Sequence, residues 1–220
     1  MKRNLTYLAL ILCFVMTVCF KNDVFAQVDY ESALAKEGLS TDDMNKFTTY
    51  YYRNKQPDKL ISILKFMLTQ EEMIVDTVHF GSAAHLFATV AHNERVFMNS
   101  LIKLKDSYSG MQRNMIEKII KEAENFISPL PNSPKDLDYL WAEFLATGKA
   151  EPIKKIISVL GLSDDNAKNI LLIGAAQWSL VSNAKQHSKV YEIIKEEFAS
   201  AQDKLKEKLE TILQRSAIQN

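Results

Sequence analysis

Apolar residues recur three and four positions apart along most of the chain from residue 40 onward, and this spacing limits the possible folds more than any other feature. Such spacing gathers apolar side chains on one side of an α-helix, whereas a half-buried strand needs strict alternation. Alternating β-branched runs are few, and the chain has only six glycines. The sequence therefore predicts an all-α fold of stacked helix hairpins, arranged as an irregular α-solenoid or a compact orthogonal bundle.

Capping residues and prolines predict where the helices begin. Ser40, followed by Asp42 and Asp43, has a hydroxyl cap and early acids, which the helix dipole favours. Proline is tolerated in the first helical turn. The expected starts are Ser40, Pro57, Thr77, Glu94 with Asn93 as its cap, Gly110, Ser133 with Pro134, Pro152, Ser163–Asp165 and Ser188. Pro129, Pro131 and Pro134 form a stiff linker.

Two predicted helices have unusual apolar patterns. The helix that passes through Ile170 to Val181 is apolar almost all round, which predicts a position enclosed by other helices. Its apolar centre is too short to span a bilayer, which needs about 20 residues. The last helix is expected to run unbroken over residues 188–217. It carries one stripe on an otherwise charged surface: Ile194, Phe198, Ala201, Leu205, Leu209 and Ile212.

The first residues predict export. Lys2 and Arg3 precede an apolar run from Leu5 to Phe20, and Val24 and Ala26 fit the small-residue positions of a cleavage site. We expect residues 1–26 to be a cleaved signal peptide and residues 27–220 to be a single helical domain. A retained membrane anchor is the alternative, although this run is shorter than the span of about 20 residues that crosses a bilayer. A lipoprotein would use Cys19, but Val18 is branched where a small residue is expected.

Removing this segment changes the chemistry that is available. Both cysteines, Cys13 and Cys19, lie within it, so residues 27–220 contain no thiol. Disulfides, thiol nucleophiles and thiolate metal sites are thereby excluded from the processed chain. This segment contains three of the 27 basic residues and one of the 27 acidic residues, so residues 27–220 have a net charge of −2. This balance gives no electrostatic reason to bind nucleic acid or an anionic membrane.

The histidines do not have the spacing of a metal site. A zinc-binding helix places two histidines four residues apart, whereas His79, His85 and His92 are separated by six and seven. His187 lies far along the chain. We therefore expect histidines that cap or pack, with no metal and no cofactor.

Catalytic motifs are equally scarce. Gly81-Ser82 and Trp178-Ser179 lack the glycine spacing of a nucleophile elbow, and no glycine-rich phosphate loop is present. Glu143 is the weak catalytic candidate, because it lies between Trp141 and Phe144 on a strongly apolar helix, where burial would raise the pKa of a carboxyl group. It can equally point outward from the flank of that helix.

Aromatic residues supply the candidate binding positions. Tyr50, Tyr51 and Tyr52 cannot all face one way on a helix, so at least one ring is expected at the surface, where tyrosine suits an interface. Trp141, Phe198 and Leu205 complete the candidate set for partner binding. The competing interpretation is that these side chains fill the core.

Two segments carry a resemblance. Trp141-Ala142-Glu143-Phe144-Leu145-Ala146-Thr147-Gly148 and Ala175-Ala176-Gln177-Trp178-Ser179-Leu180, followed by Asn183-Ala184 and His187, are similar to segments of uncharacterised bacterial secreted helical proteins. The similarity extends over about residues 50–194. It implies a helical fold and bacterial export, and it implies no activity.

These observations leave three functional hypotheses. The first is an exported, non-enzymatic helical scaffold, in the periplasm or outside the cell, that binds a protein or peptide. The second is a carrier of a small molecule or lipid, with an apolar cavity around the helix of Ile170 to Val181. The third is a hydrolase in which folding brings Glu143 to a histidine.

Overall fold

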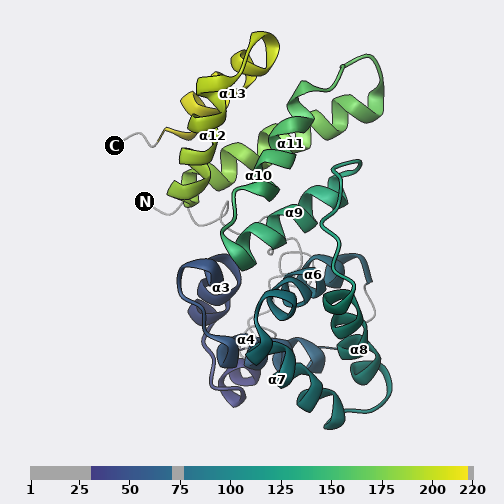
Figure 1. Cartoon of the computed structure of the whole chain (residues 1–220). Coiled ribbons are helices and arrows are strands. Elements are labelled where there is room, and N and C mark those ends of the chain that lie inside the picture. The colour runs from purple at the N-terminus through teal and green to yellow at the C-terminus, as the bar shows by residue number, and fades with distance from the viewer. Residues whose placement is uncertain (1–30, 71–76, 218–220) are drawn as a thin grey trace. The chain divides into compact units, whose positions relative to one another are not determined.

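The computed structural model describes residues 31–70 and 77–217, and these residues form helices without any strand. The predicted all-α class is confirmed. Residues 31–36 are helical, and the elements that follow are α3 (Thr41–Thr49), η1 (Tyr51–Arg53), α4 (Pro57–Thr69), α6 (Thr77–Asn93), α7 (Arg95–Asp106), α8 (Gly110–Glu124), α9 (Pro134–Thr147), α10 (Glu151–Ser158), η2 (Val159–Gly161), α11 (Ala167–Gln186), α12 (Ser188–Ser200) and α13 (Asp203–Ser216) (Figure 1). The predicted signal peptide lies outside the described residues.

The chain divides into two compact units. Unit 1 contains the residues up to Ile127 together with Leu145–Thr147, and unit 2 contains Ser128–Phe144 and the residues from Gly148 onward. The prediction of a single helical domain over residues 27–220 stays a prediction. Each unit contains three consecutive helices that contact one another, namely α6, α7 and α8 in unit 1 and α11, α12 and α13 in unit 2.

Helix α6 is the centre of unit 1. From Phe80 to Ala91 almost every side chain is buried, and α7 and α8 both pack against this helix. Stacked Phe87 and Phe97 rings, 6.4 Å apart, join α6 to α7. Burying such a side chain contributes about 1.5–3 kcal/mol, so this apolar helix gains most from a central place.

The start of α3 shows how local sequence sets a helix boundary in unit 1. Ser40 Oγ accepts a hydrogen bond from the Asp43 backbone N–H at 3.1 Å, and Asp43 Oδ2 accepts one from the Ser40 N–H at 3.0 Å. This reciprocal pair is a capping box. Helix α3 ends at Thr49, and a 3-10 turn follows at Tyr51–Arg53.

Helix α9, of which Pro134–Phe144 lie in unit 2, has ends that match the sequence signals. Ser133 caps α9 by accepting from the Asp136 N–H, with Pro134 in the first turn. Gly148 ends α9 with φ of 65°, a left-handed conformation that costs glycine no Cβ clash. Helix α11 then contacts α10, η2, α12 and α13.

The C-terminal segment corrects a prediction. The unbroken helix expected over 188–217 is two helices, because Ala201 and Gln202 are extended and Asp203 has a positive φ of 47°. The break lets α13 turn back alongside α12 (Figure 1). Ile194 and Leu209 are both fully buried. A straight helix would extend one half of the stripe away from α11, and burial outweighs the modest cost of left-handed aspartate.

Candidate functional site

Helix α11 has one apolar side that faces solvent. Ile170 is 54% exposed, Leu171 is 70% exposed and Trp178 is 47% exposed. At 100° per residue these three side chains and Gly174 span about 100° of the helix circumference. We call Ile170, Leu171, Gly174 and Trp178 the outer face of α11. Scattered exposed apolar residues are ordinary, but a contiguous group of large ones marks an interaction surface.

This exposure corrects the expectation that α11 is enclosed on all sides. Its other sides carry the buried residues Leu172, Ile173, Ala176, Ser179, Leu180, Asn183 and Ala184. Val181, two turns after Gly174 on the same side as the outer face, is also buried, so the exposed patch ends at Trp178. The neighbours α10, η2, α12 and α13 pack against this helix within unit 2. An all-round apolar sequence shows that a helix can be buried, but not that enough neighbours exist to cover it.

Gly174 lies at the middle of the outer face. Glycine in a helix interior is less stable than alanine by about 0.5–1 kcal/mol. A Cβ built at Gly174 would meet no atom within 4 Å, and its φ is not in the left-handed range. The described packing therefore gives no reason for glycine here, whereas close approach of another backbone from outside would give one.

Charged residues stand at both ends of α11. Asp164 and Asp165 are exposed in the turn that precedes the helix, and Lys185 is exposed in its last turn on the same side as Gly174. The N-cap itself is Asn166, whose side chain accepts from the Asn169 N–H at 2.9 Å. The predicted cap at Ser163–Asp165 is thus wrong, because the side chain that bonds the first turn of α11 is that of Asn166.

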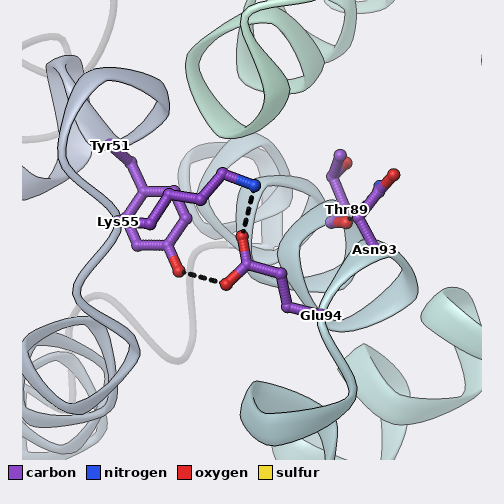
Figure 2. Close-up of polar contacts among 5 residues, drawn as sticks. All are labelled: Tyr51, Lys55, Thr89, Asn93 and Glu94. Carbon is purple, nitrogen blue, oxygen red and sulfur yellow. Dashed lines mark hydrogen bonds and ion pairs between the residues drawn. The ribbon is translucent and has the colours of Figure 1, made fainter.

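A second polar group lies in unit 1 around Glu94, the residue that precedes α7. Tyr51 Oη donates to Glu94 Oε2 at 2.8 Å, and Lys55 Nζ lies 2.9 Å from Glu94 Oε1 (Figure 2). The lysine contact is an ion pair without hydrogen-bond alignment. Burial, and then the Glu94 carboxylate, raise the pKa of Tyr51 well above its usual value. We call Tyr51, Lys55 and Glu94 the Glu94 cluster.

The Glu94 cluster has the character of a structural clamp. Tyr51 is fully buried and the Glu94 side chain is only 16% exposed, while the Lys55 side chain is 48% exposed. The cluster joins the η1 segment to the turn between α6 and α7, 43 residues along the chain. Because the phenol is fully buried and donates to the carboxylate, the cluster ties these two segments of unit 1 together.

The end of α6 explains why the predicted Asn93 cap is wrong. Asn93 Nδ2 donates to the Thr89 backbone oxygen and Thr89 Oγ1 donates to the His85 backbone oxygen, both at 2.8 Å. Figure 2 shows both side chains beside Glu94 at this helix end. These bonds satisfy carbonyls of α6 itself, so Glu94 becomes the residue before α7.

Two histidines of α6 pack against an aromatic ring. The Phe126 ring stacks on His85 at 5.5 Å and on His92 at 4.8 Å. Buried His85 pairs through Nδ1 with Glu122, and His92 Nδ1 contacts the Ala123 backbone oxygen at 3.1 Å. In the described part of the chain no three metal-ligating side chains come together. The side chain of His79 lies outside the described residues.

Glu143 does not present its carboxylate to solvent. It is 5% exposed and makes a polar or electrostatic interaction within the protein. His187, which is fully buried between α11 and α12, lies edge-on to Phe144 at 5.8 Å. Glu143 and His187 both take part in interactions within the protein. The hydrolase hypothesis, in which folding brings Glu143 to a histidine, stays a prediction.

A serine and a lysine meet in unit 2. Lys155 Nζ lies 2.5 Å from Ser128 Oγ and also donates to the backbone oxygens of Ser128 and Pro129, at 3.4 and 3.3 Å. Serine–lysine pairs can serve as nucleophile and base. Here the three acceptors match the three N–H donors of an ammonium group, which suits a tie between α10 and the proline linker.

The candidate partner-binding residues divide into two groups. Tyr51 and Trp141 are fully buried, so their prediction as contact residues is corrected to interior packing. Tyr50 and Tyr52 are partly exposed and flank the Arg53 guanidinium, at 5.0 and 5.6 Å.

The two candidates from the C-terminal segment are partly buried. Phe198 has Lys206 Nζ 5.4 Å from its ring centre, and Leu205 lies in the first turn of α13. Neither is among the strongly exposed large apolar residues. The outer face of α11 was missed as a site, although the all-round apolar pattern and Trp178 were visible in the sequence.

No family model, no curated protein and no solved structure matches this chain. The similarity to secreted bacterial helical proteins therefore stays a prediction. Within residues 31–70 and 77–217, no helix combines the length and apolarity that a membrane span requires.

Proposed function

We propose that this protein is an exported, non-enzymatic helical scaffold that binds a protein or peptide partner through the outer face of α11. The observation that carries the proposal is the exposure of Ile170, Leu171 and Trp178 on one side of a 20-residue helix. Partly exposed tryptophan is enriched among the residues that dominate interface energetics. A helix face with anchors at i, i+1 and i+8 also suits helix-to-helix or helix-to-groove contact.

Export is supported by the basic start, the apolar run of residues 5–20 and the small residues at Val24 and Ala26. The periplasm or the extracellular space is the corresponding location. The near-neutral charge of residues 27–220 supports a protein partner over nucleic acid. The non-enzymatic part is supported by the sequence, which has neither a nucleophile elbow nor a glycine-rich phosphate loop.

The test is site-specific photo-crosslinking in the native cells. A photoreactive amino acid replaces Trp178 in one variant and Val96, a 66% exposed residue of α7 in unit 1, in the control. We expect defined adducts from position 178 and none, or different ones, from position 96. Equal labelling from both positions, or none from 178 at native expression levels, would refute the outer face as a binding surface.

A further inference from the structure

We infer that the partner on the outer face of α11 is a second copy of this chain, in which two α11 helices lie antiparallel about a two-fold axis near Gly174 and Ala175. This inference rests on the proposed function and names the occupant of the same surface. A two-fold interface uses the same patch on both copies, so the patch must be complementary to itself.

The order of side-chain sizes along the outer face meets this requirement. Large residues, Ile170 and Leu171, precede Gly174 and Ala175, and large Trp178 follows them. In an antiparallel pair centred between residues 174 and 175, Leu171 of one copy lies opposite Trp178 of the other. The small residues then face each other at the centre, where the lack of a side chain at Gly174 permits close contact between the helices.

The charges along α11 favour the same direction. Exposed Asp164 stands ten residues before Gly174 and exposed Lys185 stands eleven after it. Asp164 precedes the first helical residue, Ala167, so an antiparallel pair brings this acidic turn of one copy near the basic last turn of the other, at both ends of the contact. A parallel pair would instead place Lys185 beside Lys185, which costs free energy.

The size of the patch predicts a weak dimer. A standard interface buries about 800 Å² on each partner. The outer face supplies three large apolar side chains on one helix, which is fewer than the 20–30 residues of such an interface. We therefore expect an equilibrium between monomer and dimer that shifts with dilution.

The first experiment is sedimentation equilibrium of the exported, processed protein over about a hundredfold concentration range, after mass spectrometry has fixed its N-terminus. We expect the average mass to rise toward twice that of the monomer. Trp178→Glu should raise the dissociation constant at least tenfold, whereas the control Val96→Glu, also at an exposed apolar position, should leave it unchanged. Circular dichroism confirms that both variants remain helical.

The second experiment tests the register by disulfide capture, since the processed chain is expected to have no cysteine of its own. Ala175→Cys should crosslink to itself. Lys185→Cys should not, but it should crosslink with a cysteine in the turn before α11, Asp164→Cys or Asp165→Cys, when the two variants are mixed. Crosslinking of Lys185→Cys with itself would overturn the antiparallel arrangement.

The two proposals fail separately. A chain that is monomeric at all concentrations, or a dimer that Trp178→Glu leaves intact, overturns the inference. In either case, a photo-adduct from position 178 to a different protein still upholds the proposed function. Loss of both the dimer and every position-178 adduct removes both proposals.

Discussion

The Glu94 cluster makes the clearest energetic prediction, because its two contacts with Glu94 differ in burial. Replacing Glu94 with alanine leaves the fully buried Tyr51 hydroxyl without its acceptor. A hydrogen bond to a charged group contributes about 1.5–3 kcal/mol, and a buried polar group without a partner costs about 1–3 kcal/mol. We therefore expect Glu94→Ala to lower the stability of unit 1 by about 2–3 kcal/mol.

The matched control is Lys55→Ala, which removes the other partner of the same carboxylate. The Lys55 side chain is about half exposed, so its ion pair should contribute only about 0–1 kcal/mol. The double variant with Tyr51→Phe isolates the buried bond, because phenylalanine leaves no hydroxyl to desolvate. A coupling free energy of about 1.5–3 kcal/mol between positions 51 and 94 is expected from this cycle.

Hydrogen exchange read by mass spectrometry gives the free energy of opening for peptides from α6 and α7, which reports on unit 1 alone. Alkaline pH supplies a second readout, since the pKa of Tyr51 is raised above its ordinary value of 10.0. The stability that this neutral phenol contributes is full below pH 10 and is lost as pH rises beyond it. Coupling below about 0.5 kcal/mol, or a larger loss from Lys55→Ala than from Glu94→Ala, would refute this reasoning.

Three further predictions concern other parts of the chain. Ser40→Ala should lower the free energy of unfolding in urea by about 1 kcal/mol at pH 7. Hydrogen bonds from Ser40 lower the pKa of Asp43, so part of this loss should be full above pH 3.8 and should disappear as the pH falls through the lowered pKa. Lys155→Met should release the tie to Ser128 and speed thermolysin cleavage in the proline linker, and an unchanged cleavage rate would contradict that role. Trp141→Ala should lower the free energy of unfolding by about 3–5 kcal/mol. Trp141→Phe should lower it clearly less, because the indole N–H donates no hydrogen bond to the described residues, and equal losses in thermal unfolding would contradict this reasoning.

Much of the helical layout could be predicted from local chemistry. The capping box at Ser40, the proline at position 57, the cap at Ser133 and the left-handed glycine at 148 each fix a boundary through groups within a few residues. Boundary errors arose where two polar residues compete for one role. Asn93 was expected to cap α7, yet its amide bonds backward to α6.

Contacts between distant segments were out of reach. Tyr51 and Glu94 are 43 residues apart and Lys155 and Ser128 are 27 apart, and no local pattern pairs them. The apolar stripe over residues 188–217 predicted helix but could not reveal the reversal at Ala201 and Gln202, which depends on burial against α11 and α12. The all-round apolar character of α11 likewise could not show which side lacks a neighbour.

The protein has only two tryptophans, and unit 2 contains them both in opposite settings. Trp141 is fully buried, whereas Trp178 is 47% exposed on the outer face. Their fluorescence therefore separates two events by colour: blue emission from Trp141 reports whether unit 2 is folded, and red, iodide-quenchable emission from Trp178 reports whether its surface is covered. An optical titration of the unlabelled protein can thus follow occupancy of α11 and integrity of its own unit in a single cuvette.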